Sequence, residues 1–183
     1  MTENAIHRVY FDTNVFVEMV ERPKDHAALL LDRIAGGWPW QKYVVVTSEL
    51  TLAELLVEPI KHAVTTGDYK LHDIYQGLMT TETNVRDIVP ISRKVLARAA
   101  LLRTQLERLG KLKVKLPDAI HLATALEMQC EVIVTNDTRF AKAAVSIGTC
   151  GSGEGDPSIR AFQRVVSLDV QSLESLALEL GCP

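Results

Sequence analysis

The sequence predicts an α/β fold, a three-layer α/β/α sandwich around a mostly parallel central sheet of about five strands. Short apolar runs alternate along the chain with longer segments that have apolar residues at helical spacing, a pattern typical of a parallel sheet covered by helices. The length of 183 residues, with 47% hydrophobic and 23% charged residues, is in the range of one globular domain with a sizeable core. We therefore expect a single domain over residues 1–183.

Five apolar runs are the expected strands. The first run is short, apolar and rich in strand-forming residues, which predicts a strand buried on both faces. Pro90 ends the third run. The five runs are Val9–Phe11, Tyr43–Val46, Val85–Val89, Val132–Val134 and Val165–Leu168.

Capping and breaking residues between these runs predict where helices begin and end. Ser48 and Ser92 are suited to the N-cap position, and Pro117 to the first helical position. Gly36-Gly37 stops a helix, and Pro59 would interrupt or kink one. The expected helices run from Val15 to near Pro23, from Asp25 to Gly36, from Ser48 across Pro59, over Tyr69–Met79, from Ser92 to Gly110, from Pro117 through Leu126, over Arg139–Ala144 and over Leu173–Leu180.

A glycine-rich stretch lies near residues 148–157. It contains four glycines but no lysine, so it lacks the lysine followed by serine or threonine that ends a phosphate-binding loop. We interpret it as a flexible loop within the domain, because the chain after it is too short for a second core. The last expected strand and helix then form a C-terminal extension.

Nothing in the sequence predicts a membrane or secreted protein. No apolar stretch reaches the roughly 18 residues that span a bilayer. The first eight residues lack the basic and apolar regions of a signal peptide. The three cysteines have no pairing or metal-binding spacing. We expect a soluble, cytoplasmic protein.

The positive charge of the chain is concentrated in one segment, although the net charge is −3. Residues 93–115 carry eight basic residues and one acidic residue, a net +7, so the rest of the chain carries −10. Such asymmetry indicates a binding face for a polyanion such as RNA, and a solvated helix face is the alternative. The basic residues are Arg93, Lys94, Arg98, Arg103, Arg108, Lys111, Lys113 and Lys115.

Four acidic residues follow an expected strand or lie near the start of an expected helix: Asp12, Glu54, Asp118 and Asp137. Ligands of parallel sheets bind outside the carboxyl ends of the strands, so the four carboxylates could converge. Converging carboxylates repel by about 4 kcal/mol per pair at ~4 Å and an effective dielectric of ~20. They stay ionised together around a cation, and oxygen ligands favour a hard one such as Mg²⁺ or Mn²⁺.

Each acid also has a local explanation. Asp12 could be a helix N-cap, with Asn14 either holding its carboxylate or serving as a turn residue. Thr51-Leu52-Ala53-Glu54 matches a capping box, although Ser48 is the better helix start and would place Glu54 inside the helix.

Asp118 would be stabilised by about 0.3–1 kcal/mol at a helix N-terminus without any function. Asp137 could be an ordinary turn residue. His121, one turn after Asp118, is interpreted as a hydrogen-bonded structural residue and is left out of the site.

Four motifs in order resemble the PIN-domain family, and most closely its VapC-like ribonuclease toxins. They are Asp12-Thr13-Asn14 after a short apolar strand, Glu54 in a Leu-Ala-Glu context, Leu116–Ala123 and Thr135–Phe140. The resemblance covers the chain from about Arg8 to Phe140. The chain is longer than a typical small toxin, and the glycine-rich loop and the tail after Pro157 have no clear counterpart.

The resemblance implies an α/β/α sandwich in which Asp12, Glu54, Asp118 and Asp137 coordinate one or two Mg²⁺ or Mn²⁺ ions and hydrolyse RNA. It also implies a type II toxin with a cognate antitoxin protein, and a homodimer. A stand-alone PIN nuclease and a non-catalytic RNA-binding or regulatory domain are the alternatives. A phosphatase with Asp12 as nucleophile is a third, from which Asn14 departs because such enzymes have a second aspartate there.

Overall fold

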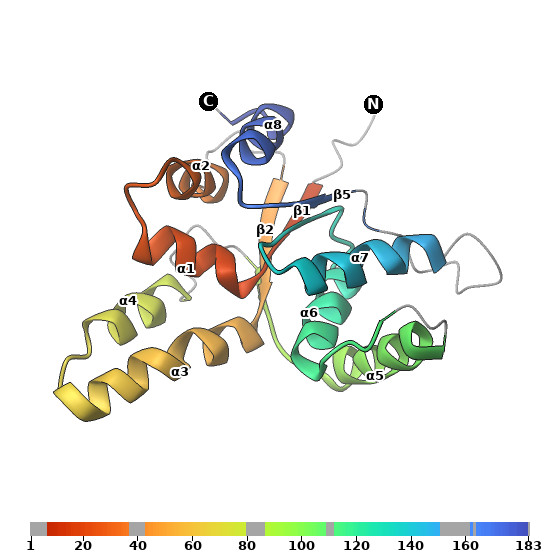
Figure 1. The fold of residues 1–183 in the computed structure, drawn as a ribbon, viewed down its shortest axis with the longest axis horizontal. Coiled ribbons are helices and arrows are strands. Elements are labelled where there is room, and N and C mark those ends of the chain that lie inside the picture. Colours follow the sequence, from red (N-terminus) through yellow and green to blue (C-terminus); the bar gives the residue numbers. More distant parts are fainter. Residues whose placement is uncertain are drawn as a thin grey trace.

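The computed structural model of the protein describes residues 7–36, 43–79, 87–108, 112–150, 162 and 164–182. A five-stranded sheet with the strand order β3-β2-β1-β4-β5 forms its centre (Figure 1). Every neighbouring pair is parallel, so the predicted fold class is confirmed. The strands are β1 (His7–Phe11), β2 (Tyr43–Ser48), β3 (Asp87–Val89), β4 (Val132–Val134) and β5 (Arg164–Val166).

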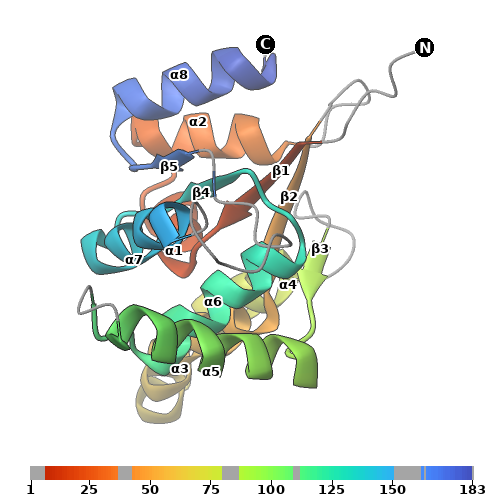
Figure 2. The ribbon, with the colours of Figure 1, turned by 90° about the vertical axis from the view of Figure 1, so that its right-hand side faces the viewer.

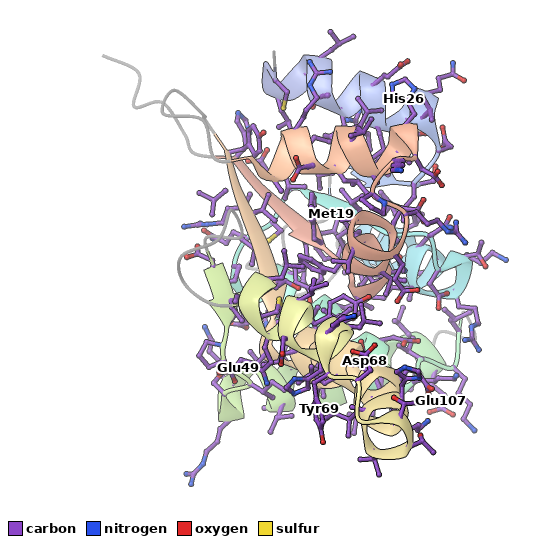
Figure 3. All side chains as sticks on the ribbon, turned by 90° about the vertical axis from the view of Figure 1, so that its left-hand side faces the viewer. Met19, His26, Glu49, Asp68, Tyr69 and Glu107 are labelled. Carbon is purple, nitrogen blue, oxygen red and sulfur yellow. The ribbon has the colours of Figure 1, made fainter. Side chains whose placement is uncertain are left out.

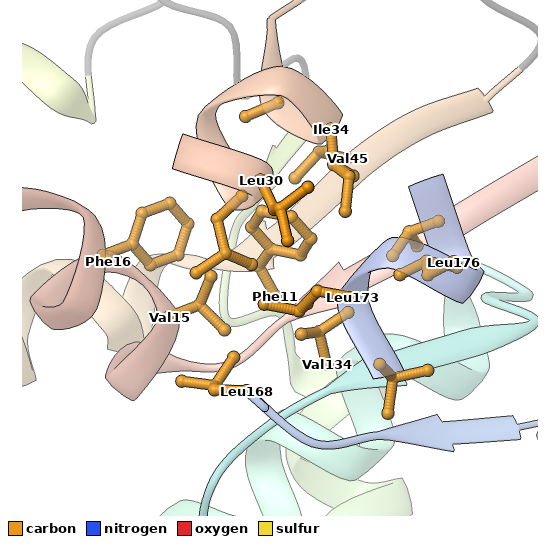
Figure 4. Close-up of a cluster of buried hydrophobic side chains, with 14 of the residues drawn as sticks. Phe11, Val15, Phe16, Leu30, Ile34, Val45, Val134, Leu168, Leu173 and Leu176 are labelled. Atoms are coloured by element: carbon orange, nitrogen blue, oxygen red, sulfur yellow. The ribbon is translucent and has the colours of Figure 1, made fainter. Parts of the chain in front are cut away.

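Helices cover both faces of the sheet, with α2 and α8 on one side and α5 and α6 on the other (Figure 2). Side chains of a strand point alternately to its two faces. Val9 and Phe11 accordingly join one buried cluster, shown in Figure 4, and Tyr10 joins the other. The helices are α1 (Thr13–Glu21), α2 (His26–Ala35), α3 (Glu49–Thr66), α4 (Lys70–Leu78), α5 (Arg93–Arg108), α6 (Leu116–Glu127), α7 (Thr138–Cys150) and α8 (Val170–Leu180).

The order of the strands creates a switch point beside β1. From β1 the chain builds outward through β2 to β3, and then returns to place β4 on the other side of β1. The connections that leave β1 and β4 therefore diverge at the carboxyl edge of the sheet, where open α/β sheets bind their ligands. The Asp12 amide donates to the Val134 carbonyl at 3.2 Å, which joins the two strand ends.

Helix α3 continues through Pro59, so the expected interruption is not present. Thr51, Leu55, Pro59 and Ala63 are buried at one-turn spacing, and α3 packs against α4. Burial of this stripe keeps the helix continuous although Pro59 lacks the amide hydrogen that would bond the preceding turn. Figure 3 shows this side of the molecule, from Glu49 at the start of α3 to Tyr69 beyond its end.

Helix α7 is longer than expected and extends into the glycine-rich stretch. Phe140, Ala143, Ala144 and Ile147 are buried at helical spacing, so the apolar stripe that sustains the helix continues past residue 144. Residues 148–150 are helical rather than loop, and residues 151–157 lie outside the described residues.

Smaller differences concern element ends. Helix α1 begins at Thr13, two residues before Val15, and Pro117 occupies the second position of α6 because Leu116 is the first. β3 is described from Asp87, and Leu168 is buried just beyond β5. Across the described ranges, none of the helices has both the length and the apolarity needed to traverse a bilayer.

Candidate metal and nucleic-acid site

Asp12 is the N-cap of α1 at the end of β1, and its carboxylate is buried and hydrogen-bonded at both oxygens. Oδ1 accepts from the Thr13 amide at 2.8 Å. Oδ2 accepts from Asn14 Nδ2 at 2.6 Å and from Thr135 Oγ1 at 2.7 Å. Burial raises the pKa of Asp12, although the charge of His121 and the bonds from Thr135 and Thr13 act in the opposite direction.

Asn14 holds Asp12, which is one of the two roles that the sequence allowed. Its side-chain oxygen also accepts from the Asn136 amide at 3.0 Å, which orients the side chain. Thr135, at the end of β4, additionally accepts from the Asp137 amide at 3.0 Å. Sequence reasoning missed Thr135, whose only signal is a hydroxyl directly after a buried strand.

Glu54 lies inside α3, because the helix begins at Glu49 and Ser48 Oγ accepts from the Leu50 amide at 3.2 Å. The capping-box interpretation of Thr51 and Glu54 is therefore wrong. Glu54 Oε2 accepts from Thr13 Oγ1 at 2.5 Å and lies 3.0 Å from His121 Nε2. Burial alone would raise the pKa of Glu54, but the bonds from His121 and Thr13 outweigh it, and the pKa is lowered.

Asp118 lies in the first turn of α6, where the helix dipole favours a negative charge. Burial and then the charge of Asp137 raise the pKa of Asp118, while the charges of Lys115 and Arg139 oppose this. The two acids are thus close enough to repel. A cation between them would remove the repulsion.

Asp137 caps α7. Its Oδ1 accepts from the amides of Arg139 at 2.7 Å and Phe140 at 3.1 Å, and its Oδ2 lies 4.0 Å from Arg139 Nη2. The local role that the sequence suggested is real. Capping uses only Oδ1, while Oδ2 forms the 4.0 Å ion pair with Arg139.

All four predicted acids line one open cleft of about 260 Å³ at the carboxyl edge of the sheet. As the side chains are placed, no three acids, histidines or cysteines among the described residues come close enough to enclose an ion. The donors are nonetheless all oxygens, and two of the four acids have raised pKa values. This set fits Mg²⁺ or Mn²⁺, since Mg²⁺ is held by one or two carboxylates and keeps several waters. The remaining lining residues are Thr13, Asn14, Val17, His121 and Phe140.

His121 was left out of the predicted site, yet it lines the cleft. It is buried, as expected of a structural histidine. Its Nδ1 lies 2.6 Å from the hydroxyl of Tyr10 and its Nε2 bonds Glu54. The available signal was its position three residues after Asp118, which places both on one face of α6.

The basic segment is partly used inside the molecule. Lys94 and Arg98 of α5 both pair with Glu127 of α6. Arg103 Nε donates to the Val114 carbonyl at 3.0 Å. These bonds hold α5 against α6 and against the segment that precedes α6. Three of the eight basic side chains are therefore used in contacts within the protein. Lys115 is the member of the run that acts on Asp118, together with Arg139, a cation that the sequence analysis did not include.

Comparisons with known proteins agree with this architecture. The family model of the PIN domain matches residues 9–146. None of the curated proteins searched matches the chain. The similar solved structures include FitAcB from Neisseria gonorrhoeae, which is 25% identical with a TM-score of 0.54; the match covers 74% of this chain and 92% of that chain.

Two further similar structures extend the likeness of fold. DNA-bound VapBC from Salmonella typhimurium is 16% identical, with a TM-score of 0.57 and coverage of 89% of this chain and 99% of that chain. VapC20 from Mycobacterium tuberculosis, described as a sarcin-ricin loop cleaving toxin, is 16% identical, with a TM-score of 0.51 and coverage of 74% and 94%. The structural neighbours thus include VapC toxins of VapBC systems, and the match to the family model shows that the chain belongs to the PIN-domain family.

Proposed function

We propose that the protein is a divalent-metal-dependent endoribonuclease that hydrolyses RNA phosphodiesters, and that it is the toxin of a type II toxin-antitoxin pair. One observation carries the proposal: four carboxylates from four separate segments line one cleft at the switch point of the sheet. Membership of the PIN-domain family and the likeness in fold to a toxin described as sarcin-ricin loop cleaving support it.

Asp12 and Asp118 are the proposed core ligands of Mg²⁺ or Mn²⁺. Glu54 and Asp137 complete the shell, directly or through water, or hold a second ion. A bound ion of this kind supplies an activated water and neutralises charge on the scissile phosphate. A serine or cysteine nucleophile is then not required.

Residues of the cleft have two tasks in this proposal: some hold the metal ligands in place, and others attract the RNA. Neutral donors fix Asp12 without cancelling its charge. Lys115 and Arg139, which lie close enough to act on Asp118, would contact RNA phosphates at the edge of the cleft. RNA choice would then depend on shape and on exposed single-stranded bases.

The toxin assignment brings partners and a location with it. A cognate antitoxin would cover the cleft or the surface beside it, in line with structural neighbours that are VapBC complexes. The family resemblance adds a homodimer, and a cytoplasmic location follows because the proposed RNA substrate and antitoxin are intracellular. The protein should be purified after expression with and without the neighbouring reading frame. The mass of each purified species then shows whether an antitoxin or a second copy of the chain is bound.

The direct test is cleavage of a structured and a single-stranded RNA by purified protein. Cleavage should require added Mn²⁺ or Mg²⁺ and stop with excess chelator. Asp118→Asn should lower it by about three orders of magnitude, as a loss of several kcal/mol of transition-state stabilisation implies. Asp32→Asn, an exposed acid on α2, is the matched control and should leave it unchanged. Undiminished cleavage in chelator or by Asp118→Asn would refute the proposal, and RNA binding without cleavage in any ion would favour the binding domain.

A further inference from the structure

The two sides of the cleft carry opposite charge. Helices α1 and α3 lie on one side, and α7 and the segment that precedes α6 lie on the other (Figure 1). Residues 13–22 and 49–66 on the first side contain five acids and two lysine or arginine residues. Residues 112–115 and 138–150 on the second side contain four lysine or arginine residues and no acid. A polyanion that reaches the cleft is therefore repelled on one side and attracted on the other.

The cations on the two sides also differ in their partners. On the acidic side, Arg22 Nη1 lies 3.3 Å from Glu18 Oε2, and Lys61 Nζ lies 2.6 Å from Glu58 Oε1. Within the described ranges, no ion pair is made by the three lysines of the basic side, which are Lys113, Lys115 and Lys142. The charge of the basic side is thus open to an external anion.

One row of cations lies on α7. This helix leads away from the cleft, because Asp137, which caps it, lines the cleft. Arg139 and Lys142 are both exposed and are three residues apart, so they lie on the same face of α7. Ala143 and Ile147 are buried on the opposite face. Lys142 is therefore one turn farther from the cleft than Arg139.

A second row lies on the segment that precedes α6. Lys113 and Lys115 are exposed and Val114 between them is buried, since successive side chains of an extended backbone point in opposite directions. Arg103 Nε donates to the Val114 carbonyl at 3.0 Å, which fixes this segment to α5. Lys115 is the N-cap of α6, three residues before Asp118, so the second row also begins at the cleft. Figures 1 and 2 both show this segment between α7 and the end of α5.

The two rows start beside the same acid and continue on the same side of the cleft. We propose that bound RNA extends from the cleft in one direction, along a phosphate track formed by Lys113, Lys115, Arg139 and Lys142, and that the side of α1 and α3 contacts none of its phosphates. The proposal rests on the proposed function, because it takes RNA as the polyanion. Contacts of this kind are made to the backbone and do not depend on sequence.

The track is tested by the binding of a single-stranded RNA in excess chelator over a salt series. Lys113→Gln and Lys142→Gln change the outer member of each row, and each should lower the slope of log K against log salt by roughly 0.7, the value for one contact to a single strand. Lys61→Gln is the matched control, an exposed lysine on the acidic side, and should leave the slope unchanged. An unchanged slope in Lys113→Gln or in Lys142→Gln, or a decrease of the same size in Lys61→Gln, would overturn the track.

The single direction is tested with RNAs of different length. The cleavage position in a short single-stranded RNA is first mapped with Mn²⁺, and nucleotides are then added on one side of that position or on the other. Affinity in chelator should rise with additions on one side only, and the double variant Lys113→Gln/Lys142→Gln should lose most of this gain. Equal gains from additions on both sides would overturn the single direction.

Failure of the track and failure of the proposed function give different results. RNA cleavage in Mn²⁺, together with salt slopes that neither variant changes, would remove the track and keep the nuclease. RNA binding with lowered slopes in both variants, but without cleavage in any ion, would remove the nuclease and keep the track. Wild-type protein that binds no RNA would overturn the track outright.

Discussion

The two halves of the cleft are held in place by different forces. Asp12 and Glu54 accept hydrogen bonds mainly from neutral side chains and from one amide. No described residue donates a hydrogen bond to the Asp118 carboxylate, and Asp137 uses one oxygen to cap α7. Lys115 and Arg139 provide this second half with charge rather than with a fixed geometry.

This difference separates a preorganised part of the cleft from a part that is held less firmly. Preorganised ligands have their geometry fixed by surrounding hydrogen bonds before anything binds. Asp12 and Glu54 meet this description, whereas the Asp118 carboxylate accepts no hydrogen bond from a described residue.

The greatest loss is expected from Asp12→Asn, which removes the charge from the preorganised half. RNA cleavage should fall by about a thousandfold or more, because each ~1.4 kcal/mol of lost stabilisation costs a factor of ten. Asp137→Asn should cost only about tenfold, since asparagine caps a helix as well as aspartate does and only charge is lost. Comparison of kcat/KM on one RNA decides, and equal losses would show that Asp137 contributes as much to cleavage as Asp12 does.

A smaller loss is expected from Thr135→Val, which keeps the volume but removes the hydroxyl that donates to Asp12 Oδ2. Mn²⁺ affinity should fall by about 10–100-fold. The control is Thr104→Val on the exposed side of α5, where the hydroxyl bonds only the Ala100 carbonyl of its own helix. Calorimetric titration with Mn²⁺ measures both, and unchanged affinity in Thr135→Val would mean that Asp12 needs no anchoring from β4.

The pH dependence follows from the raised pKa values of Asp12 and Asp118. Without an ion, the folded state holds these protons more tightly than the unfolded chain does. The contribution of the two groups to stability is thus present at low pH and is lost as pH rises through the folded pKa. An ion needs the deprotonated carboxylates, so its affinity should decline on acidification from a pH above the ordinary value of about 4.

Thermal melts with and without Mn²⁺ at about pH 5 and about pH 7 check this sign. The ion-induced rise in Tm should be larger at the higher pH. A rise of the same size at both values would show that neither carboxyl titrates in this window when the ion binds.

The smallest effect concerns the cations beside the second half. Lys115→Gln and Arg139→Gln should each weaken RNA binding modestly and lower the slope of log K against log salt by roughly 0.7–0.9. Fluorescence anisotropy in chelator over a salt series gives the slope. Arg22→Gln, whose side chain pairs with Glu18 on α1, should leave the slope unchanged. Equal slopes in all three variants would show that neither Lys115 nor Arg139 contacts an RNA phosphate, and that other residues make these contacts.

Much of the molecule could be predicted because it depends on local pattern. Short apolar runs, cap residues and helical spacing act within a few residues, so the strands, most of the helices and the parallel fold class were recognised. The four acids could be proposed as a site for the same reason, since three of them lie at a recognisable strand end or helix start and Glu54 lies one turn into a helix. Local pattern also offered two caps, Ser48 and Thr51, and favoured Ser48, which is the N-cap of α3.

Long-range packing decided the remaining features. The buried stripe of α3 carries the helix through Pro59. Glu127 took two of the basic charges because α5 lies against α6. Tyr10 meets His121, and Thr135 meets Asp12, across more than a hundred residues of chain. Such pairs depend on which segments become neighbours in space, and no window of neighbouring residues contains both partners.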